Sequence, residues 1–149
     1  MSDLKDFARL VGLDHGLCVV STLRSDGTIQ SSVVNAGVLS HPVTGEQVVG
    51  LVALGGSRKL DNLRARPRAT AVIRAGWEWA AAEGPVELAG PDDPLPGVDG
   101  ERLRLLLREI FTAAGGSHDD WPAYDRVMAE ERRTAVLLKP ARVSTNPRG

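Results

Sequence analysis

The sequence is short of the residues that form disulfide bonds or hold metal ions. It has a single cysteine, Cys18, which excludes an internal disulfide and any C-x-x-C metal or redox motif. Cys18 lies in the apolar run LCVVSTL, so we expect a buried structural thiol. The three histidines share no metal-ligand spacing and stand at His15, His41 and His118. We therefore expect a protein that binds no metal.

The chain also lacks long apolar runs and a charge excess of either sign. No run approaches the ~20 apolar residues of a membrane span, and the start MSDLKDFARLVGL lacks the basic-then-apolar layout of a signal peptide. The formal net charge is −1, which gives no general reason to bind nucleic acid or an anionic membrane. These absences predict a cytoplasmic protein with neither nucleic acid nor membrane as partner, in which any basic site is local.

The remaining composition is that of an ordinary folded domain. Of the 149 residues, 42% are hydrophobic and 25% are charged. A chain of this length buries roughly 70% of the surface of its unfolded state. We find no internal repeat or low-complexity segment, and we expect one domain over residues 1–149.

Hydrophobic periodicity and turn residues divide this domain into strands and short helices. Two β-type runs lie within residues 17–39, and the Asp-Gly pair between them is a strong hairpin signal. Further strands are predicted at residues 47–54, 68–74, 77–90 and 134–146, with a bulge or bend at Gly84-Pro85. Helical spacing predicts helices within residues 4–13, from residue 57, and within residues 103–114 and 117–133. The order predicts an α+β domain built on a six-stranded antiparallel barrel with flanking short helices.

The stretch ALGGSRKLDNLRARP, residues 53–67, places cations where a helix begins. Ser57 is a suitable N-cap, and Leu60 and Leu63 give the following segment an inward face. Arg58 and Lys59 then lie in the first turn, where a cation opposes the helix dipole at a cost of ~0.3–1 kcal/mol each. A bound anion would reverse the sign of that effect.

The same residues have the chemistry of a phosphate site. Helical spacing lets Arg58, Lys59 and Asn62 converge near the helix start, beside the Ser57 hydroxyl and the backbone amides of the first turn. Gly55-Gly56 would let the backbone approach a ligand closely at the end of the preceding strand. The pattern is neither a Walker loop nor a GxGxxG turn. By itself it leaves open a solvated helix with surface charges.

The order of these motifs resembles the pyridoxamine 5′-phosphate oxidase-like split β-barrel superfamily. A hairpin with GTIQSSVV, a strand, the corner GSRKLDNLRARPRATAVI and a strand with AEGPVEL carry the likeness, which covers roughly residues 5–146. The segments GWEWAAAEGPVEL, HDDWPAYDRVMAEERR and LLKPARV resemble its actinobacterial deazaflavin-dependent branch, the FDOR-B type, which uses coenzyme F420.

The resemblance implies a cofactor site at the interface of a homodimer. It assigns the cofactor phosphate to Ser57, Arg58, Lys59 and Asn62. It assigns the tricyclic ring to the strand that carries Val34, Asn35 and Ala36, with the strand that ends at Gly55 and Gly56 along the same ring edge. Because family members carry two sites at the dimer interface, Trp77 and Trp79 are expected to reach the partner's cofactor.

The function that the resemblance implies is F420-dependent oxidoreduction. Hydride would pass between reduced F420 and an electron-poor small molecule, such as an enone, a quinone or a tetrapyrrole-like compound. This chemistry belongs to the cofactor and needs no protein nucleophile, so no catalytic residue is assigned. The spacing of Tyr124 favours packing, and the position of His118 favours a surface turn, over a role for either in proton donation.

The sequence also departs from the true pyridoxamine phosphate oxidases. Its second strand offers Asn35 and small residues where they carry an arginine, and its tail RVSTNPRG lacks their arginine-rich signature. Both departures argue against vitamin B6 oxidation and against tight, conventional FMN binding. Two alternatives stay open: an FMN-dependent oxidoreductase of the same fold, and a non-catalytic carrier of a flavin, a deazaflavin or a tetrapyrrole.

Overall fold

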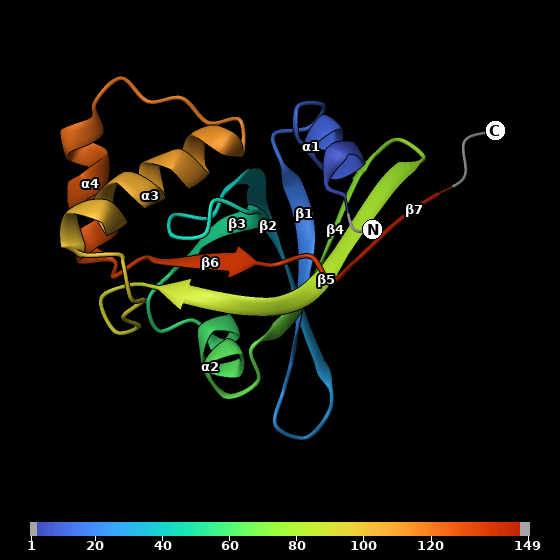
Figure 1. The fold of residues 1–149 in the computed structure, drawn as a ribbon, viewed down its shortest axis with the longest axis horizontal. Coiled ribbons are helices and arrows are strands. Elements are labelled where there is room, and N and C mark those ends of the chain that lie inside the picture. The colour runs from blue at the N-terminus through green and yellow to red at the C-terminus, as the bar shows by residue number, and fades with distance from the viewer. Residues whose placement is uncertain (1–2, 147–149) are drawn as a thin grey trace.

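The structure, a computed structural model, describes residues 3–146, which form seven strands and four helices (Figure 1). Residues 1–2 and 147–149 lie outside the described part. They belong to the predicted domain over residues 1–149, and residues 147–149 also belong to the tail RVSTNPRG. The strands are β1 (Leu17–Leu23), β2 (Ile29–Ser40), β3 (Gln47–Ala53), β4 (Arg68–Ala75), β5 (Glu78–Ala89), β6 (Thr134–Leu138) and β7 (Arg142–Thr145). The helices are α1 (Lys5–Val11), α2 (Arg58–Ala65), α3 (Gly100–Ala113) and α4 (Trp121–Glu130).

Six of the strands close a barrel. Their order is β4-β1-β2-β3-β6-β5, and a further pairing between β4 and β5 joins the two ends of the sheet. Every neighbouring pair is antiparallel. The predicted fold class, an α+β split barrel of six antiparallel strands with short flanking helices, is confirmed.

The last predicted strand, residues 134–146, is two strands. Both β6 and β7 run along the same edge of β5, and they are separated at Pro140, which has no backbone N–H to donate. Gly84 of β5 lies opposite this break, where a β-carbon would stand 2.0 Å from the carbonyl oxygen of Lys139. The irregularity expected at Gly84-Pro85 therefore lies in the facing strand, and Gly84 makes room for it.

The barrel interior is closed by two helices. Apolar residues on alternate positions of the strands, such as Val20 and Ile73, point inward and are buried. Phe7 of α1 and Leu60 of α2 join the same buried cluster. Cys18 also belongs to it, which confirms the predicted buried thiol, and burial raises the pKa of Cys18 to about 12.

A second buried cluster joins the barrel to α3 and α4. Strands β3 and β6 are buried on both faces, because Val48 and Leu137 point outward toward the helices while their neighbours point into the barrel. The helices contribute Leu106, Ile110 and Tyr124 to this cluster. In Figure 1, α3 and α4 lie side by side along one flank of the barrel.

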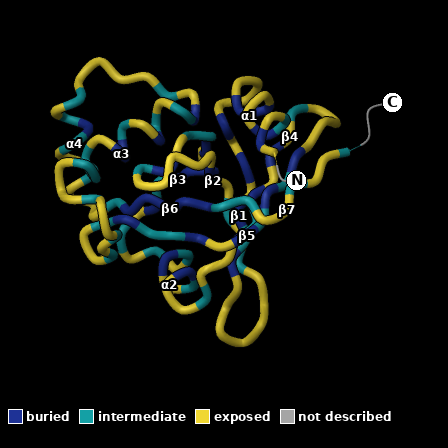
Figure 2. The backbone as a smooth tube through the Cα atoms, viewed as in Figure 1, coloured by how far each residue is buried: buried dark blue, intermediate teal, exposed yellow. Residues whose placement is uncertain are grey.

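No segment within residues 3–146 covers one outer face of the barrel. The outward side chains of β1, β2 and β4 include Val19, which pairs with Val33 on one side and with Val72 on the other. These three side chains are exposed, as are Leu17, Leu23 and Ile29 around them. Figure 2 shows that the tip of the β1–β2 hairpin projects from the barrel and is exposed along its length.

No helix within residues 3–146 combines the length and the apolar character needed to cross a bilayer.

Candidate functional site

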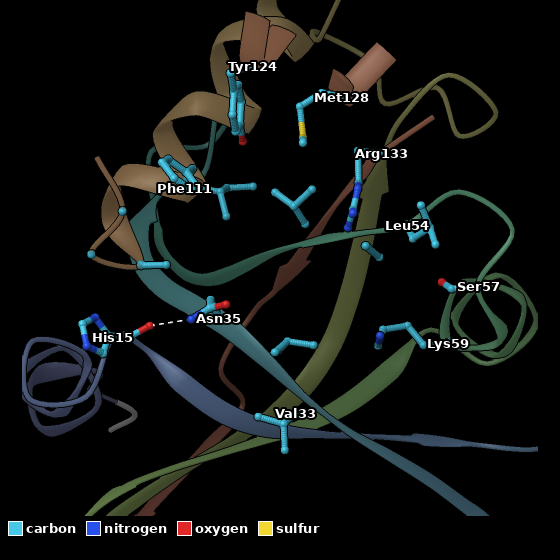
Figure 3. A pocket seen from close by; sticks show the side chains of 17 residues that line it. His15, Val33, Asn35, Leu54, Ser57, Lys59, Phe111, Tyr124, Met128 and Arg133 are labelled. Atoms are coloured by element: carbon cyan, nitrogen blue, oxygen red, sulfur yellow. Dashed lines mark hydrogen bonds between the residues drawn. The ribbon is translucent and has the colours of Figure 1, made fainter. Parts of the chain in front are cut away.

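A cleft of about 680 Å³ lies between the barrel and the two C-terminal helices (Figure 3). Its floor comes from β2 and β3, and the start of α2 stands at one end. Its far wall comes from α3, α4 and the segments that follow them. The lining residues are His15, Val33, Val34, Asn35, Val52, Ala53, Leu54, Ser57, Lys59, Ile110, Phe111, Ala114, Gly115, Gly116, Tyr124, Met128 and Arg133.

The corner between β3 and α2 turns sharply into one end of this cleft. Gly56 has a φ of +81°, a conformation that glycine adopts without strain, and Ser57 follows as the N-cap of α2. The Ser57 N–H donates to the carbonyl of Leu54 at 3.1 Å. The Ser57 Oγ caps no helix amide, is buried, and has no hydrogen-bond partner in the described structure. A buried hydroxyl without a partner beside the unpaired amides of a helix start is suited to an external acceptor.

Lys59 extends into the cleft from the first turn of α2. Burial lowers the pKa of its ammonium group, and the positive charge of Arg133 lowers it further. Among residues 3–146, Lys59 forms no ion pair and no acidic side chain lines the cleft. This end of the cleft therefore holds two cations, of which Arg133 pairs with Glu131 outside the cleft lining and Lys59 has no carboxylate partner. A bound anion would favour the charged form of Lys59.

The other two residues of the predicted phosphate site lie elsewhere. Arg58 is exposed and does not line the cleft. Asn62 donates from Nδ2 to Oγ1 of Thr22 at 3.1 Å, a bond that fastens α2 to β1. Successive helix residues are rotated by about 100°, so Arg58 and Lys59 leave the helix in different directions. The three side chains do not converge on one patch, and a cofactor contact by Arg58 or Asn62 stays a prediction.

Strand β2 supplies two of its three predicted ring contacts to the cleft. Val34 and Asn35 line it, and Asn35 Nδ2 donates to the backbone carbonyl of His15 at 2.7 Å. Ala36 is fully buried in the barrel core and does not line the cleft. Neighbouring residues of a strand point to opposite faces, which places Asn35 and Ala36 on different sides of β2.

Gly55 and Gly56 shape the corner but are not among the lining residues. The Gly55 N–H donates to the carbonyl of Glu131 at 3.1 Å, and a β-carbon at Gly55 would lie 2.7 Å from Cβ of Arg132. Glycine is required here because two distant segments of the chain touch. At Gly55 the close approach is to the turn after α4, and a ligand contact by Gly55 or Gly56 stays a prediction.

Trp77 and Trp79 lie away from this cleft, at the β4–β5 turn. The side chain of Trp77 is 95% exposed and that of Trp79 is 36% exposed, and neither lines the cleft. Trp79 is tied by its backbone N–H to Asn146 Oδ1 at 3.1 Å. Their expected contact with a partner's cofactor stays a prediction.

The apolar wall of the cleft was not predicted from the sequence. Phe111, Tyr124 and Met128 come from α3 and α4, whose helical spacing indicated only packing. Tyr124 is packed as expected: its hydroxyl donates to the carbonyl of Leu107 at 2.9 Å, and burial raises its pKa to about 12. The sequence signal for these residues was the amphipathic pattern of the two helices, which does not distinguish a core face from a cleft wall.

His15 and Arg133 also line the cleft without having been predicted to do so. His15 lies in the turn before β1 with a φ of +57°, and Asn35 holds its carbonyl. Arg133 follows α4 and lies near the start of α2. His118, in contrast, caps the local turn: its Nδ1 accepts from the Asp120 N–H at 3.0 Å.

Comparison with solved structures identifies the fold and leaves the activity open. No protein-family model matches the sequence. A pyridoxamine 5′-phosphate oxidase-related, FMN-binding protein from Nostoc punctiforme superposes with a TM-score of 0.68 at 14% identity, over 97% of this chain and 84% of that protein. A conserved hypothetical protein from Mycobacterium tuberculosis gives 0.65 at 18% identity, again over 97% and 84%. An F420 reductase gives 0.59 at 17% identity, over 90% of this chain and 93% of that protein. At these identities the likeness shows the split-barrel fold.

Proposed function

We propose that the protein is an oxidoreductase that binds a flavin-type cofactor in this cleft, and that the cofactor is the deazaflavin F420. The observation that carries the proposal is the cation-lined, carboxylate-free end of the cleft, which holds the buried unpartnered Ser57 hydroxyl. Two structural neighbours support it by name, one as an F420 reductase and one as an FMN-binding protein. When bound, such a cofactor supplies two-electron hydride chemistry.

The residues of the cleft fit the two ends of such a molecule. Ser57, Lys59 and the first amides of α2 would hold a phosphate, since a helix start and a cation together favour an anion. Val34, Phe111 and Met128 would contact an apolar ring system and exclude water from it. The volume of about 680 Å³ lies within the usual range for a small-molecule site.

The protein's part in the reaction is then to bind, orient and desolvate. Asn35 stiffens the floor of the cleft through its bond to the His15 carbonyl. The hydroxyl proton of Tyr124 is committed to the Leu107 carbonyl, so Tyr124 serves to support the wall of the cleft. The proton that accompanies hydride transfer would come from solvent or from a nearby acid. The acceptor is an electron-poor small molecule, with enones, quinones and tetrapyrrole-like compounds as the class to be tested.

We further propose that two copies pair through the uncovered face of β1, β2 and β4. Val33 belongs to this face and also lines the cleft, so a second copy would close the cleft from that side. The expected contact of Trp77 and Trp79 with a partner's cofactor likewise requires a second copy. The test is the molar mass in solution by light scattering. Val19→Glu, which introduces a charge on the face without touching the cleft, should convert a dimer to a monomer, whereas a monomeric native protein would refute the pairing.

The experiment for the cofactor separates F420 from FMN. The purified protein is titrated with each cofactor, and binding is followed by the change in cofactor fluorescence. Preferred binding of F420 supports the proposal, and preferred binding of FMN supports the FMN-dependent alternative. The oxidation of reduced F420 is then followed with a panel of enones, quinones and biliverdin-like acceptors. Tight binding without turnover of any acceptor would refute the enzymatic role in favour of a carrier.

A further inference from the structure

The second cation of the cleft, Arg133, comes from a segment that packs against the corner between β3 and α2. The turn after α4 contacts the β3–α2 corner through the bond from the Gly55 N–H to the Glu131 carbonyl, at 3.1 Å. The side chain of Arg132 is so close to Gly55 that no β-carbon would fit there. Two segments about 75 residues apart in the sequence are therefore joined at the point where Lys59 and Arg133 line one cleft.

The two neighbouring arginines of this turn lie in different surroundings. Arg132 has a φ of +50°, in the left-handed region that side chains rarely adopt. Its guanidinium forms an exposed ion pair with Asp92, with Nε 3.2 Å from Oδ2. The side chain of Arg133, in contrast, points into the cleft (Figure 3). The unusual conformation at Arg132 thus directs Arg133 inward.

Part of the Arg133 guanidinium remains available for a ligand. Nε and Nη2 both lie 2.8 Å from Oε1 of Glu131, an exposed carboxylate on the same turn. Nη1 forms no hydrogen bond within residues 3–146, and an unsatisfied guanidinium edge in a partly buried site favours an anionic partner. Glu131 fixes the orientation of the side chain without lining the cleft itself.

We propose that Arg133 is a ligand-binding residue that, together with Lys59, holds two negative charges at the anionic end of the ligand. This inference rests on the proposed function and adds to it that the ligand must carry two negative charges at its anionic end. One source of two charges is a phosphate monoester, as in FMN. The other is a phosphate diester with a neighbouring carboxylate, as in the side chain of F420. A ligand with the same ring and no anionic tail should gain nothing from Arg133.

The test compares Arg133→Gln with a control that removes the same charge elsewhere. Arg126→Gln is suitable because Arg126 is exposed on α4 and does not line the cleft. We expect Arg133→Gln to weaken the binding of F420 or FMN about 10- to 100-fold, the loss of one charge-assisted hydrogen bond. The control should leave the affinity within about twofold. Riboflavin and a phosphate-free deazaflavin nucleoside should bind both variants alike.

Competition with inorganic phosphate distinguishes a phosphate monoester from a phosphate diester with a neighbouring carboxylate. If both charges lie on one phosphate, Arg133→Gln also weakens the binding of inorganic phosphate; if they are divided, it weakens F420 alone. Arg133→Lys keeps the charge and should recover most of the affinity. A melting temperature of Arg133→Gln that is no lower than that of the native protein verifies that the fold is intact.

Distinct results overturn the inference and the proposed function. Unchanged affinity for F420 and FMN in Arg133→Gln overturns the inference alone, as does an equal loss for the phosphate-free ligands. If the native protein binds no flavin, but inorganic phosphate raises its melting temperature in a manner that needs Arg133, the proposed function fails and the anion site stands. If neither flavin nor phosphate binds, both are overturned.

Discussion

Replacing Lys59 by methionine should stabilise the unliganded protein and weaken its ligand binding. The side chain becomes one atom shorter, stays unbranched and loses a charge that nothing in the described structure neutralises. That charge is half-buried, is repelled by Arg133 and lies in the first turn of α2. Each of these features disfavours the ammonium group when no anion is bound.

The expected magnitudes follow from the position of the charge. A cation in the first turn of a helix costs about 0.3–1 kcal/mol. For a domain of this size, that corresponds to a melting temperature higher by about 1–4 °C in Lys59→Met. In the ligand complex, the loss of a charge-assisted hydrogen bond costs about 1.5–3 kcal/mol, which is about 10- to 150-fold in affinity.

The pH dependence of the stability gain has a defined sign. Below the lowered pKa of Lys59 in the folded state, the ammonium group is charged in both states and its cost is fully present. As the pH rises through that pKa toward the ordinary value of 10.5, the folded protein releases the proton first and the cost disappears. The advantage of Lys59→Met should therefore be present at pH 7 and absent above about pH 10.5.

Thermal unfolding of the unliganded protein and fluorescence titration of the cofactor measure the two effects. Lys5→Met is the matched control, because Lys5 is the first residue of α1 and its side chain is exposed. If the melting temperature rises less in Lys5→Met than in Lys59→Met, the difference measures what burial and the charge of Arg133 contribute at Lys59. A lower melting temperature in Lys59→Met, or an unchanged affinity, would refute the reasoning.

Three further changes test the structure around the cleft. Gly37→Ala should lower the free energy of unfolding by about 1–3 kcal/mol or more, because its β-carbon would stand 2.3 Å from the α3 backbone. Gly100→Ala is the control: Gly100 lies in open space at the start of α3, so this change should be neutral or stabilising, and urea unfolding compares the two variants. Tyr124→Phe should lower the free energy of unfolding by about 0.5–1.5 kcal/mol through loss of the bond to the Leu107 carbonyl, and a changed pH profile of turnover would contradict a purely supporting role. Burial raises the pKa of Cys18 to about 12, from 9.0 ordinarily, so the stability that the neutral buried thiol contributes is full below pH 9 and declines between pH 9 and 12. The free energy of unfolding of Cys18→Ala should therefore fall less than that of the native protein over this pH range.

Local sequence patterns predicted most of the fold because the interactions behind them are local. The Asp-Gly pair produced the β1–β2 hairpin, with Gly27 at a φ of +88°. Asp120 caps α4 by accepting a hydrogen bond from the Ala123 N–H, an interaction that spans only three residues of the chain. The one strand that was mispredicted, residues 134–146, divides where Pro140 and Gly84 face each other, a pairing that neither local sequence reveals.

The candidate site was predicted less completely than the fold. Of the four residues predicted to hold the cofactor phosphate, Ser57 and Lys59 line the cleft, and their contact with a cofactor stays a prediction. Helical spacing alone could not tell that Asn62 would bond to Thr22 of β1, because that partner is 40 residues away. Nor could it tell that the Ser57 hydroxyl, at the predicted N-cap, would accept no amide bond.

The sequence by itself determined the order of strands and helices, the antiparallel barrel and the cationic start of α2, since periodicity, turn residues and helix caps act over a few residues. Only the tertiary structure decided which of those cations line the cleft. The contact of Gly55 with the turn after α4 places Arg133 beside Lys59, and the packing of α3 and α4 places Phe111 and Met128 across from them. Contacts between segments so far apart depend on how the whole barrel packs, because no short stretch of sequence contains both partners.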